Sequence, residues 1–149
     1  MSDYAFTTVW RTRAPLEAVW QEIYDTEAWP SWWKGVEQVI TLREGEADGL
    51  GSVYRYTWKS KLPYRLTFDM EIVTIEPPRC LEGVATGELV GRGCWHLWTE
   101  GDETIVRYDW IISTTKRWMN TLAVVARPLF RWNHDVVMGW GAEGLSQRL

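Results

Sequence analysis

The fold is decided by residues Ser113–Leu149, whose sequence is STTKRWMNTLAVVARPLFRWNHDVVMGWGAEGLSQRL. At 3.6 residues per turn, this stretch predicts a long helix with two neighbouring faces that are largely apolar. The first face comprises Ala123, Ala126, Phe130, His134, Val137, Met138, Gly141 and Leu145. The second comprises Trp118, Leu122, Leu129, Val136 and Trp140. A helix that is apolar over about half of its circumference needs a concave partner, because a flat surface would cover only one stripe.

The chain before this helix is a series of strand patterns, most of them joined by short turns. The predicted strands are Tyr4–Arg13, Val36–Arg43, Ser52–Lys59, Tyr64–Glu76, Arg79–Thr86, Leu89–Thr99 and Thr104–Ser113. Short turns between successive strands indicate an antiparallel meander. A curved sheet of this kind is the concave partner that the helix requires, and a sheet curved around one helix tends to leave a cavity.

Two helices interrupt the strands after the first one. Pro15 suits the first helical position, and the apolar spacing of Leu16–Ile23 predicts an amphipathic helix that ends at Trp29-Pro30. Pro30–Gly35 predicts a second, short helix. We therefore predict an α+β fold in one domain, residues 1–149. Its parts are a curved seven-stranded antiparallel sheet, two short helices after the first strand and a long C-terminal helix over a cavity.

Glycines occur at three positions inside the last helix, namely Gly139, Gly141 and Gly144. Each costs roughly 0.5–1 kcal/mol relative to alanine in a helix interior. They are explained if the sheet or a ligand approaches the helix backbone closely, or if the helix breaks near Gly139. We expect the close approach.

Composition excludes several classes of protein. The chain has 16 basic and 20 acidic residues, a net charge of −4, which argues against nucleic acid as a partner. We find no membrane span and no signal peptide, so we expect a cytoplasmic protein. Cys80 and Cys94 lie in strand-like runs and are expected to be reduced thiols. The chain has no nucleotide-binding fingerprint and no metal-ligand spacing, so neither a cofactor nor a metal is expected.

Twelve tryptophans are the compositional outlier. A buried indole needs a partner for its N–H group, and one domain rarely uses so many indoles for packing alone. Large flat rings also line sites for apolar or aromatic ligands. Ordinary core packing and pocket lining both remain open for these side chains.

His134 is the candidate catalytic residue, because it lies on the apolar face of the last helix and its ordinary pKa suits a general acid or base. The alternative is a buried histidine whose nitrogens are satisfied by the sheet. His96 lies on a strand whose alternation places Leu89, Gly91, Gly93, Trp95 and Leu97 inward. We therefore expect His96 to face outward with Arg92; the reverse orientation would bring both into the pocket.

The chain resembles the START-like superfamily, also called SRPBCC or helix-grip proteins. It looks most like the bacterial members described as polyketide cyclase/dehydrase or lipid-transport-like. The resemblance rests on Ala14–Trp20, Trp29–Trp33, Gly51-Ser52, Pro77-Pro78-Arg79, Gly91–Trp95 and Thr104-x-Val106-x-Tyr108. It implies a deep cavity between a seven-stranded sheet and the C-terminal helix, used for lipids, sterols, polyketides or other apolar molecules. It carries over no catalytic motif.

Three functions are compatible with these observations. The first is binding of an apolar small molecule, aromatic and polyketide-like or lipidic, by a monomer or homodimer. The second is a cofactor-independent cyclase or dehydratase that uses His134 as acid or base. The third is a protein-interaction module with Trp29, Trp32, Trp33 and Trp132 in an exposed patch. The predicted ligand-binding residues are Trp10, Tyr56, Trp58, Phe68, Met70, Trp95, Tyr108, Trp110, Phe130, His134 and Met138.

Overall fold

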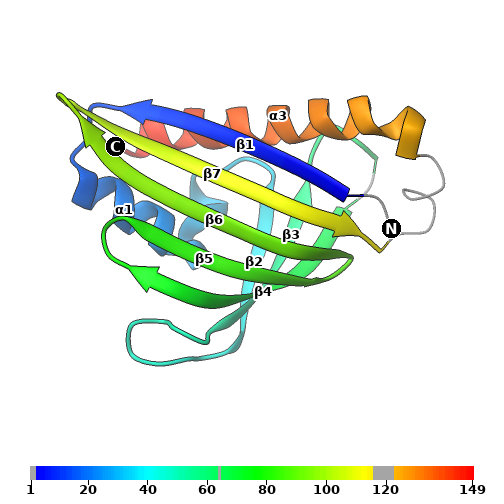
Figure 1. The fold of residues 1–149 in the computed structure, drawn as a ribbon, viewed down its shortest axis with the longest axis horizontal. Coiled ribbons are helices and arrows are strands. Elements are labelled where there is room, and N and C mark those ends of the chain that lie inside the picture. The colour runs from blue at the N-terminus through cyan, green and yellow to red at the C-terminus, as the bar shows by residue number, and fades with distance from the viewer. Residues whose placement is uncertain (1–2, 64, 116–122) are drawn as a thin grey trace.

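The computed structural model describes residues 3–63, 65–115 and 123–149, and its main feature is one curved sheet (Figure 1). The seven strands are β1 (Asp3–Thr12), β2 (Val36–Arg43), β3 (Val53–Lys59), β4 (Arg65–Glu76), β5 (Cys80–Gly87), β6 (Leu89–Glu100) and β7 (Glu103–Thr114). Neighbours pair antiparallel in the order β1-β7-β6-β5-β4-β3-β2. The predicted seven-stranded antiparallel sheet is confirmed, with β1 returning to pair with the last strand.

Two short helices follow β1 as predicted, but the boundary between them differs. Helix α1 (Leu16–Tyr24) ends before Trp29, and the 3-10 helix η1 (Thr26–Ser31) contains Pro30 instead of beginning with it. The buried indole of Trp29 donates a hydrogen bond to the carbonyl oxygen of Glu22 at 3.1 Å. This contact folds the chain back onto α1, so tertiary packing ends the helix earlier than the proline would.

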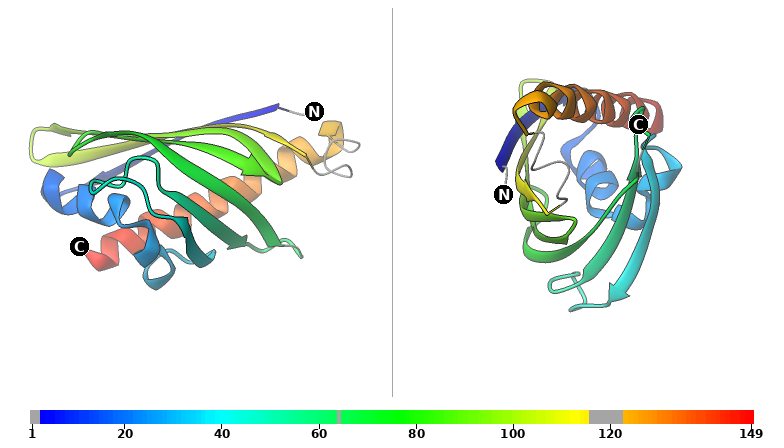
Figure 2. Two further views of the ribbon diagram at one scale, coloured as in Figure 1. Left: turned by 90° about the horizontal axis from the view of Figure 1, so that it is seen from below. Right: turned by 90° about the vertical axis from the view of Figure 1, so that its right-hand side faces the viewer.

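The sheet and the helices enclose a common interior. Helix α3 (Ala123–Arg148) runs along the open side of the curved sheet, and α1 with η1 lies at one end of it (Figure 2). Buried side chains from the sheet, α1, η1 and α3 form a hydrophobic cluster. Within the described parts of the chain, no helix is both long enough and apolar enough to cross a membrane.

One of the two predicted faces of α3 is buried and the other is only partly covered. The buried face comprises Phe130, Val137, Met138, Gly141 and Leu145, with His134 nearly buried among them. On the adjoining face, Leu129 is 46% exposed and Val136 and Trp140 are half-buried. The concave sheet therefore holds α3 mainly through one face and covers the adjoining face only in part, because the sheet is open on that side. Trp118, Leu122 and the side chains of Ala123 and Ala126 lie outside the described residues.

Two of the helical glycines lie where the backbone of α3 meets the segment after η1. A Cβ atom on Gly141 would lie 2.5 Å from the indole ring of Trp33, and one on Gly144 would overlap the carbonyl oxygen of Trp32. The expected close approach is found at these two positions. At Gly139 a Cβ atom would meet nothing within 4 Å, and α3 continues through it, so a helix break there is ruled out.

Candidate ligand-binding cavity

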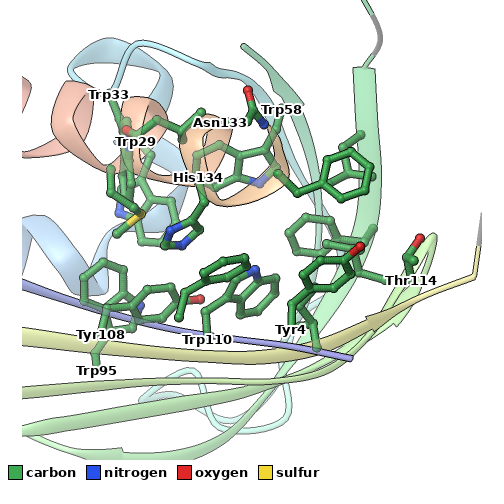
Figure 3. A pocket seen from close by; sticks show the side chains of 18 residues that line it. Tyr4, Trp29, Trp33, Trp58, Trp95, Tyr108, Trp110, Thr114, Asn133 and His134 are labelled. Carbon is green, nitrogen blue, oxygen red and sulfur yellow. Dashed lines mark hydrogen bonds between the residues drawn. The ribbon is translucent and has the colours of Figure 1, made fainter. Parts of the chain in front are cut away.

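A cavity of about 130 Å³ lies between the concave face of the sheet and the buried face of α3 (Figure 3). A second cavity of about 40 Å³ shares part of its wall. We call them the first and the second cavity. The first is lined by side chains from β1, β3, β4, β6, β7, α3 and the segment around η1. Most of its wall is aromatic.

The structure places most of the sequence-predicted ligand-binding residues on these walls. Those that line the first cavity are Trp58, Phe68, Trp95, Tyr108, Trp110, Phe130, His134 and Met138. Tyr56 and Met70 line the second cavity only. Trp10 lines neither cavity, because its ring packs behind the wall against Trp33 and Trp95, at centroid distances of 5.3 and 5.6 Å.

Sequence reasoning missed the other residues that line the first cavity. They are Tyr4, Phe6, Trp29, Trp33, Leu66, Leu89, Ile112, Thr114, Asn133 and Val137. The alternation of β1 already grouped Tyr4 and Phe6 with Trp10, so extending the candidate list along that strand would have found both. Trp29 and Trp33 carry no such signal, because tertiary contacts place them: Trp29 donates to Glu22 of α1 and Trp33 donates to Val137 of α3.

His134 reaches from α3 into the first cavity toward the sheet (Figure 3). Its ring stacks on Phe6 with a centroid distance of 4.3 Å and an interplanar angle of 15°. Burial lowers the pKa of His134 to about 4, so the imidazole is neutral at physiological pH. The carboxylate of Asp135 lies 3.9 Å from Nδ1, beyond hydrogen-bond distance, and is mostly exposed. The alternative of a histidine satisfied by the sheet is not observed, since neither ring nitrogen has a hydrogen-bond partner among the described residues.

Three other polar atoms in the lining are buried without a partner in the described parts of the chain. They are the hydroxyl of Tyr4, Nε1 of Trp58 and Oδ1 of Asn133. A buried polar group with no hydrogen bond costs about 1–3 kcal/mol, and few occur in native proteins without a reason. Their concentration at one cavity is the feature that a bound molecule would explain.

Two tyrosine hydroxyls sit deeper in the interior. Burial raises the pKa values of Tyr56 and Tyr108, so both hydroxyls remain protonated and able to donate. Tyr108 stacks on Trp95 with a centroid distance of 4.1 Å and occupies the space beside Gly93, where a Cβ atom would contact its ring. Trp95 and Tyr108 both line the two cavities, so this stack forms part of the wall between them.

Several other candidates lie away from the cavities. On β6, Leu89, Gly93, Trp95 and Leu97 are buried, whereas His96 is half-buried and lines neither cavity. Burial raises the pKa of Cys80 to about 11 and also raises that of Cys94, so both are protonated thiols. The described residues contain no group of three His, Cys, Asp or Glu side chains that could hold a metal ion.

The expected exposed tryptophan patch is not present. Trp29, Trp32 and Trp33 are all at most 8% exposed, and only Trp132 of the four lies at the surface, 45% exposed. The three buried rings pack on one another and on the sheet, with centroid distances from 5.0 to 6.5 Å among them. These indoles therefore serve the interior and not a protein-interaction surface.

A curved antiparallel sheet that encloses a cavity with a C-terminal helix defines the helix-grip architecture. A START superfamily protein from Mycobacterium smegmatis has this fold with a TM-score of 0.77 at 15% identity, over 97% of this chain and 95% of that one. An aromatase/cyclase from Streptomyces sp. R1128 gives 0.72 at 15% identity, over 99% and 93%. A norcoclaurine synthase variant from Thalictrum flavum, solved with a transition-state analogue, gives 0.65 at 9% identity, over 98% and 93%.

No protein-family model and no curated protein matches the sequence. At such low identities the structural likeness establishes the fold alone. The chain has the helix-grip fold of the START-like superfamily, as the sequence landmarks predicted. The solved structures of this fold include both a transition-state-analogue complex of an enzyme and a protein described only by its superfamily. What this chain does must therefore be argued from its own cavity.

Proposed function

We propose that this protein binds an apolar small molecule, of aromatic or lipidic character, in the first cavity. The observation that carries the proposal is an aromatic-walled cavity that also contains buried polar atoms with no hydrogen-bond partner among the residues that the structure describes. Apolar walls provide the affinity for such a ligand, and a few polar groups fix its orientation. The aromatase/cyclase among the structures with this fold is in keeping with an aromatic ligand.

Native mass spectrometry of the purified protein, followed by organic extraction, tests whether it carries a ligand. A second test uses fluorobenzene, an apolar probe of one ring whose binding is followed by fluorine NMR, and a matched pair of variants on β7. Ile112 lines the first cavity and is 6% exposed, whereas Ile111 faces outward and is 54% exposed. Ile112→Trp should fill the cavity and abolish probe binding, and Ile111→Trp should bind like the wild type. Equal binding by both variants would place the probe elsewhere and contradict the proposal.

An enzymatic function is the second candidate, and it is favoured by the state of His134. A neutral imidazole in a cavity, whose nitrogens have no partner in the described part of the chain, is able to accept a proton from a bound molecule. With a pKa near 4 it acts as a base at neutral pH, and it would become an acid only after taking up the substrate's proton. The chemistry would be that of a cofactor-independent cyclase or dehydratase, with tyrosine hydroxyls polarising a carbonyl group.

The enzymatic role is tested on whatever molecule the extraction identifies. His134→Gln should lower turnover by about 10²–10⁴-fold, the usual contribution of a general base, and leave binding largely unchanged. Turnover that is unaffected in a variant that still binds would remove His134 from the mechanism.

A further inference from the structure

The proposed function leaves the size and charge of the ligand open, and the lining of the first cavity restricts both. Resting on that function, we propose that the ligand is an uncharged, single-ring aromatic molecule with a hydroxyl-type substituent. We also propose that Phe68 sets this size limit by separating the two cavities.

The volume limits the ligand to about one ring. A cavity of about 150 Å³ is known to hold benzene, whereas drug-sized ligands need about 300–1,000 Å³. The first cavity, at about 130 Å³, is close in volume to the cavity that holds benzene and well below that of drug-sized sites. Bulky rings such as Trp33, Trp58 and Trp95 occupy the space that a larger ligand would need.

The lining also rejects a charged ligand. None of the described residues that line the first cavity is Lys, Arg, Asp or Glu. Arg127 and Arg131 lie over the rings of Tyr4 and Phe6, at 4.9 and 5.2 Å from the ring centroids, and are not part of the lining. His134 is neutral there. A carboxylate or phosphate bound in this cavity would be buried without a counter-charge, which is strongly unfavourable.

The free polar atoms favour a substituent that both donates and accepts hydrogen bonds. Trp58 Nε1 is a donor only, whereas the unprotonated nitrogen of a neutral His134 is an acceptor. Both side chains reach into the same space in Figure 3. A phenolic hydroxyl accepts from an indole N–H and donates to an imidazole nitrogen, so one such group would satisfy both. A hydrocarbon would leave both unpaired.

Phe68 stands between the two cavities. It lines both of them, and its ring contacts Trp110 on one side (5.5 Å between centroids) and Tyr56 on the other (5.9 Å). Trp110 lines only the first cavity and Tyr56 only the second. Trp29, Trp58, Trp95 and Tyr108 also line both cavities, but only Phe68 among the five also contacts both Trp110 and Tyr56. Removing its ring should therefore join the two spaces, and we assign to Phe68 the limit on ligand length in this direction.

The test is isothermal titration calorimetry at pH 7 with four probes. 4-Methylphenol has the proposed chemistry, 4-methylbenzoate adds a charge, toluene lacks the hydroxyl, and 2-naphthol adds a ring. The wild type should bind 4-methylphenol at least about tenfold more tightly than each of the others, a difference of about 1.4 kcal/mol. Binding of 4-methylbenzoate or 2-naphthol as tight as that of 4-methylphenol would overturn the proposal.

Phe68→Ala should bind 2-naphthol at least about tenfold more tightly than the wild type does. The milder variant Phe68→Leu should show the same gain, and it is included in case Phe68→Ala does not fold. Ile111→Ala on the outer face is the control and should leave all four affinities unchanged. No gain by a folded Phe68 variant would overturn the role of Phe68. If fluorobenzene or toluene binds as tightly as 4-methylphenol, this inference fails and the proposed function stands. If nothing binds, both fail.

Discussion

His134 illustrates how one side chain is held in an unusual state by its surroundings. It stacks on Phe6, faces an aromatic cavity and has no hydrogen-bond partner for either nitrogen in the described parts of the chain. The exposed carboxylate of Asp135 raises the pKa of His134, and nearby Arg131 lowers it by a smaller amount. The dominant effect is burial, which penalises the charged imidazolium.

This state predicts how stability depends on pH. The pKa of His134 is about 4 in the folded protein and about 6.5 in an unfolded chain. Below pH 6.5 the unfolded state therefore binds a proton that the folded state does not, and stability is lost as the pH falls toward 4. Between pH 7.5 and 5 we expect this group to cost about 2 kcal/mol. Urea unfolding of the wild type and His134→Gln at both pH values measures it, and an equal loss in both proteins would contradict it.

Asn133 lines the first cavity with a buried polar atom that should lower the stability of the protein. Its Oδ1 is buried without a partner in the described residues, so a well-packed apolar side chain should be more stable there. We expect Asn133→Leu to raise the free energy of unfolding by about 1 kcal/mol. Trp132→Leu, at the exposed neighbouring position, should change it by less than about 0.5 kcal/mol. Chemical denaturation gives both values. A destabilised Asn133→Leu would mean that the amide makes a stabilising interaction after all.

At the residue scale, the wall residues that the sequence identified all lie on elements whose regular period fixes the direction of the side chain. The helical period placed His134 and Met138 toward the interior, and strand alternation did so for Trp95 and Tyr108. Strand alternation failed for Trp10, whose side chain also points inward but is covered by Trp33 and Trp95. Facing the interior and lining a cavity are different properties, because an inward-facing side chain lines a cavity only where no neighbouring side chain covers it.

At the scale of elements, α3 depends on small residues where it meets the segment after η1. Trp33 packs against Gly141 and donates from Nε1 to the carbonyl oxygen of Val137 at 2.9 Å. A large ring can approach a helix backbone this closely only where no side chain intervenes. Glycine lowers the stability of the helix at this position, and the contact with Trp33 offsets that loss.

Two glycine substitutions in α3 should have opposite effects. Gly141→Ala would place its Cβ 2.5 Å from the Trp33 ring, so we expect it to destabilise the protein by about 1–3 kcal/mol despite the better helix propensity of alanine. Gly139→Ala meets nothing within 4 Å and should stabilise by about 0.5–1 kcal/mol. Urea denaturation of the two variants tests the pair. If both were stabilising, the ring of Trp33 would have to move at little cost.

The predicted elements agree with the structure where pattern alone determines them. Strand patterns in the sequence predicted all seven strands, because the side chains of a half-buried strand alternate between its two faces. The end of α1 was placed too late, since it depends on a long-range fit of Trp29 and not on the local proline signal. The second apolar face of α3 was expected to be covered, and helical periodicity cannot tell how far a sheet wraps around.

For the whole molecule, the cavity is a junction between elements that are distant in the sequence. Side chains of β1, of the segment around η1, of four other strands and of α3 meet there, whereas α1 contributes none. A bound molecule would therefore connect α3 to the sheet. Opening of α3 would then break contacts with the ligand in addition to those with the protein, so the ligand should raise the free energy of that local opening.

Hydrogen exchange should detect this connection. With 4-methylphenol bound, we expect slower amide exchange in α3 around 130–138 and little change in α1, which does not reach the cavity. At a free probe concentration of 100 times its Kd, protection against any opening that releases the probe should rise by about 2.7 kcal/mol. Ile112→Trp, with its cavity filled, should show no probe-dependent protection, and Ile111→Trp should behave like the wild type. Protection that persists in Ile112→Trp would locate the probe on the outer surface of α3, where Leu129 and Trp132 are exposed, and not between the helix and the sheet.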